Sequence, residues 1–94
     1  MDYSTTTNLF SRYELPTGEA RYEFAQFRTR AVTMTTRQLL GVFEANKQAV
    51  KDYSDNPALQ HHCTTAAARR DFCAAVLNQT RGLKFDYAVD GFKY

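Results

Sequence analysis

The 94-residue chain carries 12 Lys and Arg against 10 Asp and Glu, with 44% apolar and 23% charged residues. This balance is typical of a folded globular protein and excludes a disordered tail, while the length provides for a single hydrophobic core. The net charge of +2 and the interleaved signs exclude the strong basic footprint that nucleic-acid binders usually show.

Residues 1–8 are polar and lack the basic and apolar regions of a signal peptide, so they are predicted to form a flexible polar leader. Residues 9–94 are then expected to be a single globular domain. No apolar run approaches the roughly 20 residues of a membrane-spanning helix, and no membrane partner is expected. Cys63 and Cys73 indicate buried thiols in a reducing compartment, which predicts a cytoplasmic location.

Residues 11–24 contain the pattern Arg-Tyr-Glu-apolar twice, on either side of Thr17-Gly18. An antiparallel hairpin centred on Thr17-Gly18 makes each Arg face a Glu and Tyr face Tyr, with about 0.2–1 kcal/mol gained per pair. We therefore predict an N-terminal hairpin. A helix is the alternative, with one apolar face at i, i+4, i+7 and i+11: Ala20, Phe24, Phe27 and Ala31.

The first of two central helices is predicted to begin at Thr35 or Thr36. Thr35 and Gln38 have the spacing of a capping box, in which a hydroxyl and an amide side chain each accept a backbone N–H. An apolar stripe at helical spacing follows. The next helix is predicted to begin at Pro57, because Pro suits a first turn and either Asp55 or Asn56 can cap it.

The second helix is predicted to run from Pro57 to about Arg81. Gly82 follows at the position where a left-handed residue closes a helix. Residues 84–94 alternate between apolar and polar side chains, which indicates a short strand. The apolar seam of this helix is expected to contain Leu59, Ala66, Cys73 and Leu77.

The predicted element order is therefore ββααβ. It describes an α+β fold in which a small antiparallel sheet, made of the N-terminal hairpin and the C-terminal strand, carries two helices on one face. If residues 19–33 are helical instead of extended, the alternative is a three-helix bundle.

His61, His62, Cys63 and Cys73 are the natural candidates for a metal site or a nucleophile. Neighbouring helical residues point about 100° apart and Cys73 lies two to three turns further on, so these groups cannot gather around one zinc ion. Cys73 has no adjacent base, and neither a serine-nucleophile motif nor a phosphate-binding glycine loop is present. The sequence predicts no enzyme, no metal and no cofactor.

Arginines supply the remaining candidates. Arg69 and Arg70 flank the apolar seam of the second helix, where arginine can bury its stem and border a contact surface. Three others lie near the predicted strand end and a helix N-terminus, a place that favours anions. The predicted interaction residues are Arg28, Arg30, Arg37, His62, Arg69 and Arg70.

These features favour a small non-enzymatic protein-interaction module, such as an adaptor, an inhibitor or an assembly subunit. Short chains of this type are common among phage, viral and plasmid accessory proteins. A protein partner is expected, and a homodimer through the Ala-rich helix or an unpaired hairpin edge is one form of it. Nucleic-acid binding through the arginines is the less favoured alternative, and it would weaken steeply with salt.

Overall fold

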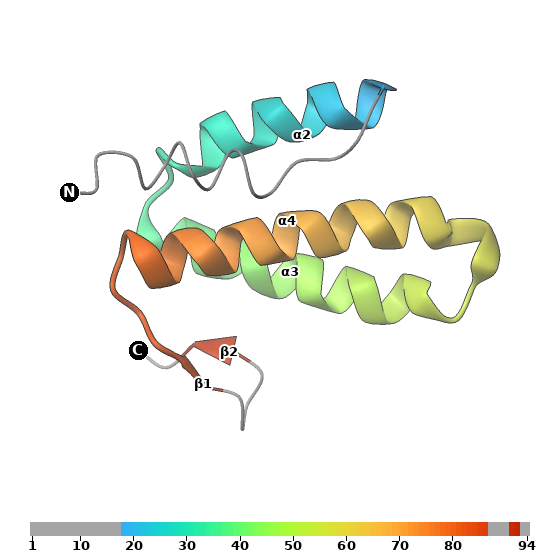
Figure 1. Cartoon of the computed structure of the whole chain (residues 1–94). Coiled ribbons are helices and arrows are strands. Elements are labelled where there is room, and N and C mark those ends of the chain that lie inside the picture. Colours follow the sequence, from blue (N-terminus) through green and yellow to red (C-terminus); the bar gives the residue numbers. More distant parts are fainter. Residues whose placement is uncertain (1–17, 87–90, 93–94) are drawn as a thin grey trace.

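The structure is a computed structural model that describes residues 18–86 and 91–92, and Figure 1 shows the arrangement of its elements. In chain order these are α2 (Gly18–Ala31), α3 (Thr36–Ser54), the short 3-10 helix η1 (Pro57–Leu59), α4 (Gln60–Gln79), β1 (Phe85–Asp86) and β2 (Gly91–Phe92). Within these residues, no helix combines the length and the apolar character needed to cross a membrane.

The predicted α+β fold with the order ββααβ is wrong. The described residues form three α-helices and one two-stranded sheet, which lies after the helices. The second strand of the predicted hairpin falls within α2. The predicted leader (1–8) and the first predicted strand (9–16) lie outside the described residues.

The spacing of the aromatic residues explains why α2 is a helix. In a strand, Phe24 and Phe27 would point to opposite faces, but residues three apart share one face of a helix. Both rings are buried together with Ala31, whereas Tyr22, the expected partner of a core tyrosine pair, is 64% exposed. Burying one phenylalanine side chain gains about 1.5–3 kcal/mol, more than the 0.2–1 kcal/mol of a cross-strand pair.

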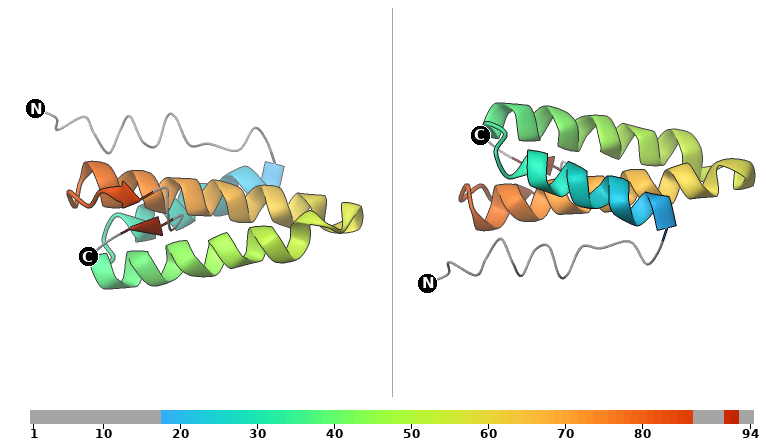
Figure 2. Two further views of the ribbon diagram at one scale, coloured as in Figure 1. Left: turned by 90° about the horizontal axis from the view of Figure 1, so that it is seen from below. Right: turned by 90° about the horizontal axis from the view of Figure 1, so that it is seen from above.

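Helices α3 and α4 run antiparallel, and α2 packs against α4 (Figures 1 and 2). The predicted capping box is confirmed: the Gln38 N–H donates to the Thr35 hydroxyl at 3.1 Å, and the Thr35 N–H donates to the Gln38 side chain at 2.9 Å. Asn56 caps the next turn by accepting the Ala58 N–H at 3.0 Å. That turn is the 3-10 helix η1, so α4 begins three residues after the predicted Pro57.

The end of α4 is close to its predicted position. Gly82 has a φ of +72°, the left-handed conformation expected of it. The Leu83 N–H then donates to the Leu77 carbonyl at 3.0 Å, which turns the chain back along the helix. β1 and β2 pair antiparallel with Phe85 opposite Phe92, so the C-terminal segment forms strands with itself and not with an N-terminal hairpin.

Among the described residues, six phenylalanines form two ring clusters in or against the core: Phe24, Phe27 and Phe72 between α2 and α4, and Phe43, Phe85 and Phe92 between α3 and the sheet. Phe72 meets Phe24 and Phe27 in edge-on fashion, with ring centres 6.3 and 6.4 Å apart. Such geometry is favourable beyond the buried area alone. The first cluster therefore fixes α2 onto the α3–α4 pair and so positions the pocket described next.

Candidate functional site

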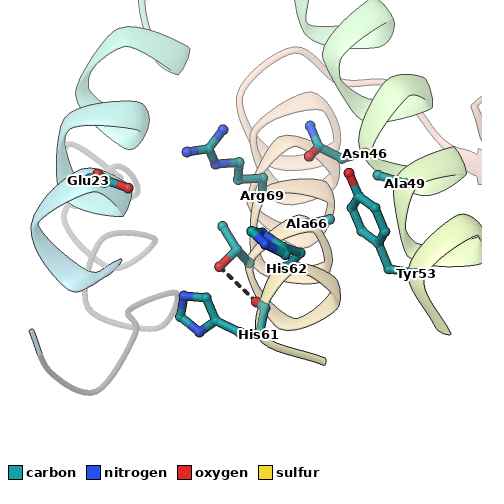
Figure 3. Close-up of a pocket in the computed structure, with 9 residues that line it drawn as sticks. Glu23, Asn46, Ala49, Tyr53, His61, His62, Ala66 and Arg69 are labelled. Carbon is teal, nitrogen blue, oxygen red and sulfur yellow. Dashed lines mark hydrogen bonds between the residues drawn. The ribbon is translucent and has the colours of Figure 1, made fainter. Parts of the chain in front are cut away.

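A pocket of about 440 Å³ lies between the three helices, and Figure 3 shows its lining. It is lined by Glu23 from α2, by Asn46, Ala49 and Tyr53 from α3, and by His61, His62, Thr65, Ala66 and Arg69 from α4. On α3 and α4 these residues recur every three or four positions and so share one face of their helix. All three helices must pack together for the pocket to exist.

Arg69 is the cationic group of the pocket. Its guanidinium carbon lies 5.0 Å from the centre of the Phe27 ring, a cation–π contact that holds the half-buried side chain in place. Its Nε atom is buried and has no hydrogen-bond partner among the described residues. A buried N–H group without a partner costs about 1–3 kcal/mol. Because Nε is covered by its neighbours, a ligand in the pocket would meet the terminal guanidinium nitrogens of Arg69, which take part in no ion pair among the described residues.

Glu23 is the anionic group of the pocket and comes from the opposite wall. Figure 3 shows its carboxylate and the Arg69 guanidinium pointing toward one another from α2 and α4. Among the described residues, no ion pair joins Glu23 to Arg69 or either of them to another side chain. The pocket therefore contains one positive and one negative side chain that do not form an ion pair with each other.

Aromatic rings form a further part of the wall. The His62 ring centre lies 5.8 Å from that of Tyr53 and 5.9 Å from that of His61, so the three rings form a chain from α3 to the start of α4. The Thr65 hydroxyl is engaged by donating to the His61 carbonyl at 3.1 Å. Asn46 is held by donating from its amide to the Val42 carbonyl at 2.9 Å. The wall thus presents aromatic rings to a ligand, together with polar side chains whose orientation is fixed by these hydrogen bonds.

The pocket brings together two of the six predicted interaction residues, His62 and Arg69. Arg70 donates from Nε to Asp71 at 2.9 Å, which largely neutralises its charge. Arg28 is buried at 4% exposure, with its guanidinium carbon 5.1 Å from the centre of the Phe24 ring. The remaining two are exposed and do not line the pocket: Arg30 and Arg37.

Sequence reasoning missed five polar residues of the pocket: Glu23, Asn46, Tyr53, His61 and Thr65. Glu23 had been assigned to the hairpin, opposite an arginine. Asn46 and Tyr53 lie seven residues apart and share a helical face with Ala49, a signal that was available on α3 alone. The approach of this face to α2 could not be predicted, because the first helix was expected to be a strand.

The two cysteines are structural groups with different surroundings. Cys73 is fully buried, as predicted, whereas Cys63 is only half-buried, with its Sγ atom 3.8 Å from the Val50 carbonyl oxygen. Burial raises the pKa of the Cys73 thiol from 9.0 to about 12, although the nearby Arg69 charge acts in the opposite direction. Cys73 is therefore protonated at neutral pH and is a poor nucleophile.

Raising the pH above 9 is expected to destabilise the fold through Cys73. The folded state keeps the thiol proton up to a pKa of about 12, whereas the unfolded chain releases it above about 9. The stability contribution is complete below pH 9 and is lost between pH 9 and 12, with a slope approaching about 1.4 kcal/mol per pH unit. Urea unfolding of the wild type and of Cys73→Ala, from pH 8 to 10.5, measures this slope as the difference between them.

The matched control for this measurement is Cys63→Ala, which leaves the buried thiol in place. Its unfolding free energy should fall with pH in parallel with the wild type, since other titrating groups contribute equally to both proteins. If the Cys73→Ala curve also ran parallel to the wild type, burial of the Cys73 thiol would not contribute to the pH dependence.

Comparisons with protein-family models, with curated proteins and with solved structures find no match for this chain. The pocket therefore has to be interpreted from its own residues. It presents one guanidinium that takes part in no ion pair among the described residues, one carboxylate from α2, and a chain of three rings. This arrangement is suited to binding a small charged group.

Proposed function

We propose that the protein is a non-enzymatic interaction module that binds a carboxylate of a partner protein in the pocket between α2, α3 and α4. The observation that supports this most directly is the Arg69 guanidinium at the pocket wall, which takes part in no ion pair among the described residues. Guanidinium and carboxylate groups match in charge and in the planar geometry of their hydrogen bonds. The module would act as an adaptor, an inhibitor or an assembly subunit in the cytoplasm.

Binding is favoured over catalysis because the potential nucleophiles near the pocket serve the structure. The Thr65 hydroxyl donates to a backbone carbonyl, and the Cys73 thiol is buried with a raised pKa. The His62 ring leans against Tyr53, 5.8 Å between centres, as expected of a contact surface. Tyrosine and arginine are also the side chains that protein interfaces use most.

The alternative of nucleic-acid binding finds less support. A strand of phosphates requires several cations along one path, but Arg70 is paired with Asp71 and Arg28 is packed against Phe24. The pocket itself contains the carboxylate of Glu23, which repels a polyanion. One guanidinium facing one carboxylate fits a single acidic group better than a chain of phosphates.

Selection of random displayed peptides on the immobilised protein tests the proposal. We expect the enriched peptides to contain Asp or Glu, or to depend on their free C-terminal carboxylate. Synthetic versions with an amidated C-terminus, or with each acid replaced by its amide, distinguish these two sources. Calorimetry should show that Arg69→Met weakens binding about tenfold or more, because removal of one partner of a close charge pair usually has an effect of this size.

The control variant is Lys84→Met, which removes one positive charge from an exposed position that does not line the pocket. Its affinity should match the wild type. Amide NMR spectra establish that Arg69→Met is folded, and Arg69→Lys, which keeps the charge without the planar fork, should bind with intermediate affinity. The proposal is wrong if no acidic peptide is enriched, or if selected peptides bind Arg69→Met as tightly as the wild type. Tight, steeply salt-dependent binding of a single-stranded oligonucleotide would instead favour the nucleic-acid alternative.

A further inference from the structure

We propose that the pocket recognises a dipolar group, with a carboxylate bound by Arg69 and a cationic nitrogen bound by Glu23. This inference rests on the proposed function and adds the chemistry of the partner. It predicts that the partner presents an acidic group together with a Lys or Arg side chain, and that Glu23 determines specificity. An acidic group alone would be bound less well.

The two charged side chains of the pocket come from different helices. Glu23 projects from α2 and Arg69 projects from α4, and the two charged ends point toward one another across the pocket in Figure 3. Neither takes part in an ion pair within the part of the chain that the structure describes. A ligand with one charge of each sign can therefore pair with both side chains at once, whereas the two side chains do not pair with each other.

The cationic end of the pocket is held in place by packing. The Arg69 guanidinium lies over the Phe27 ring, in the cluster that attaches α2 to α4. Movement of Arg69 toward Glu23 would therefore give up a cation–π contact. Glu23, in contrast, is exposed at the pocket edge and can adjust to a ligand. The pair thus combines one fixed and one adaptable charge.

The size and the net charge of the pocket also fit a dipolar ligand. A volume of about 440 Å³ lies within the range of small-molecule pockets, roughly 300–1,000 Å³, so both charged groups of a ligand fit inside. The formal charges of Arg69 and Glu23 cancel, so a ligand of zero net charge enters without an uncompensated charge. A polyanion, in contrast, meets the Glu23 carboxylate at close range and is repelled by it.

A ladder of simple ω-amino acids tests the inference with defined probes. Glycine, β-alanine, 4-aminobutanoate and 6-aminohexanoate carry the two charges at increasing separation. Acetate, propanoate, butanoate and hexanoate carry only the carboxylate on a chain of the same length. Amide NMR titrations at low ionic strength measure the affinity of each probe for the full chain. We expect at least one amino acid to bind about two- to fivefold more tightly than its plain carboxylate, the range expected for an exposed ion pair.

Glu23→Gln should abolish this preference and leave the affinity for the plain carboxylates unchanged or slightly higher. Glu44→Gln is the matched control, since Glu44 is exposed on α3 and does not line the pocket. Its preference should equal that of the wild type. If no amino acid outperforms its plain carboxylate, or if Glu23→Gln retains the preference, the dipolar inference is overturned. The proposed function then still stands, provided that Arg69→Met loses the plain carboxylates; if Arg69→Met binds every probe like the wild type, the proposed function fails as well.

Discussion

Replacing Phe72 by alanine is expected to lower the free energy of unfolding by about 3–5 kcal/mol, the usual cost of deleting a buried aromatic side chain. Phe72 is fully buried, and its ring meets the edges or faces of both Phe24 and Phe27. Its loss removes the centre of the cluster that attaches α2 to α4. Because small domains have a total unfolding free energy of about 5–15 kcal/mol, the variant should lose a large fraction of its stability.

Urea unfolding followed by far-ultraviolet circular dichroism measures the effect. Phe72→Leu keeps much of the volume and should be clearly less destabilising than Phe72→Ala. Tyr22→Ala, which removes an exposed ring from α2, should stay within about 0.5 kcal/mol of the wild type. A loss below 1 kcal/mol for Phe72→Ala would contradict the packing of α2 through this cluster.

Replacing Arg81 by methionine is expected to cost about 1.5–3 kcal/mol, the range for hydrogen bonds that involve a charged group. Arg81 follows α4 and reaches the connection between α2 and α3. Its guanidinium donates to the Met34 carbonyl at 2.6 Å, to the Val32 carbonyl at 3.4 Å and to the Thr36 hydroxyl at 3.1 Å. One side chain thus joins the beginning of α3, the end of α2 and the end of α4.

Unfolding free energies of Arg81→Met and Arg81→Lys test this prediction. Lysine keeps the positive charge but cannot reproduce the planar fork, so it should recover only part of the lost stability. Lys84→Met removes a nearby exposed charge and should leave stability within about 0.5 kcal/mol. If Arg81→Met and Lys84→Met had equal effects, the three hydrogen bonds of Arg81 would not contribute measurably.

The central helices could be predicted because their boundaries depend on contacts within a few residues. The Thr35–Gln38 capping box, the Asn56 cap and the left-handed Gly82 are local features, and each was found at or near its predicted place. The three hydrogen bonds of Arg81 could not be predicted, because its partners lie 45 to 49 residues away in the chain. Long-range hydrogen bonds leave no periodic signal in a sequence.

The N-terminal segment was predicted wrongly because two local patterns competed. The repeated Arg-Tyr-Glu suits facing strands, whereas Phe24, Phe27 and Ala31 suit one face of a helix. The helix prevails because Phe72 of α4 supplies a surface on which that face is buried. Cross-strand pairs at the surface cannot match this gain.

The sequence by itself determined the two central helices, the capping box of α3, the burial of Cys73 and the mixed charge of the chain, since these depend on neighbouring residues and composition. Only the tertiary structure decided that residues 18–31 are helical and that Glu23 faces Arg69 across a pocket. The physical reason is that the pocket depends on the packing of three helices, and α2 is attached through aromatic contacts between residues more than forty positions apart.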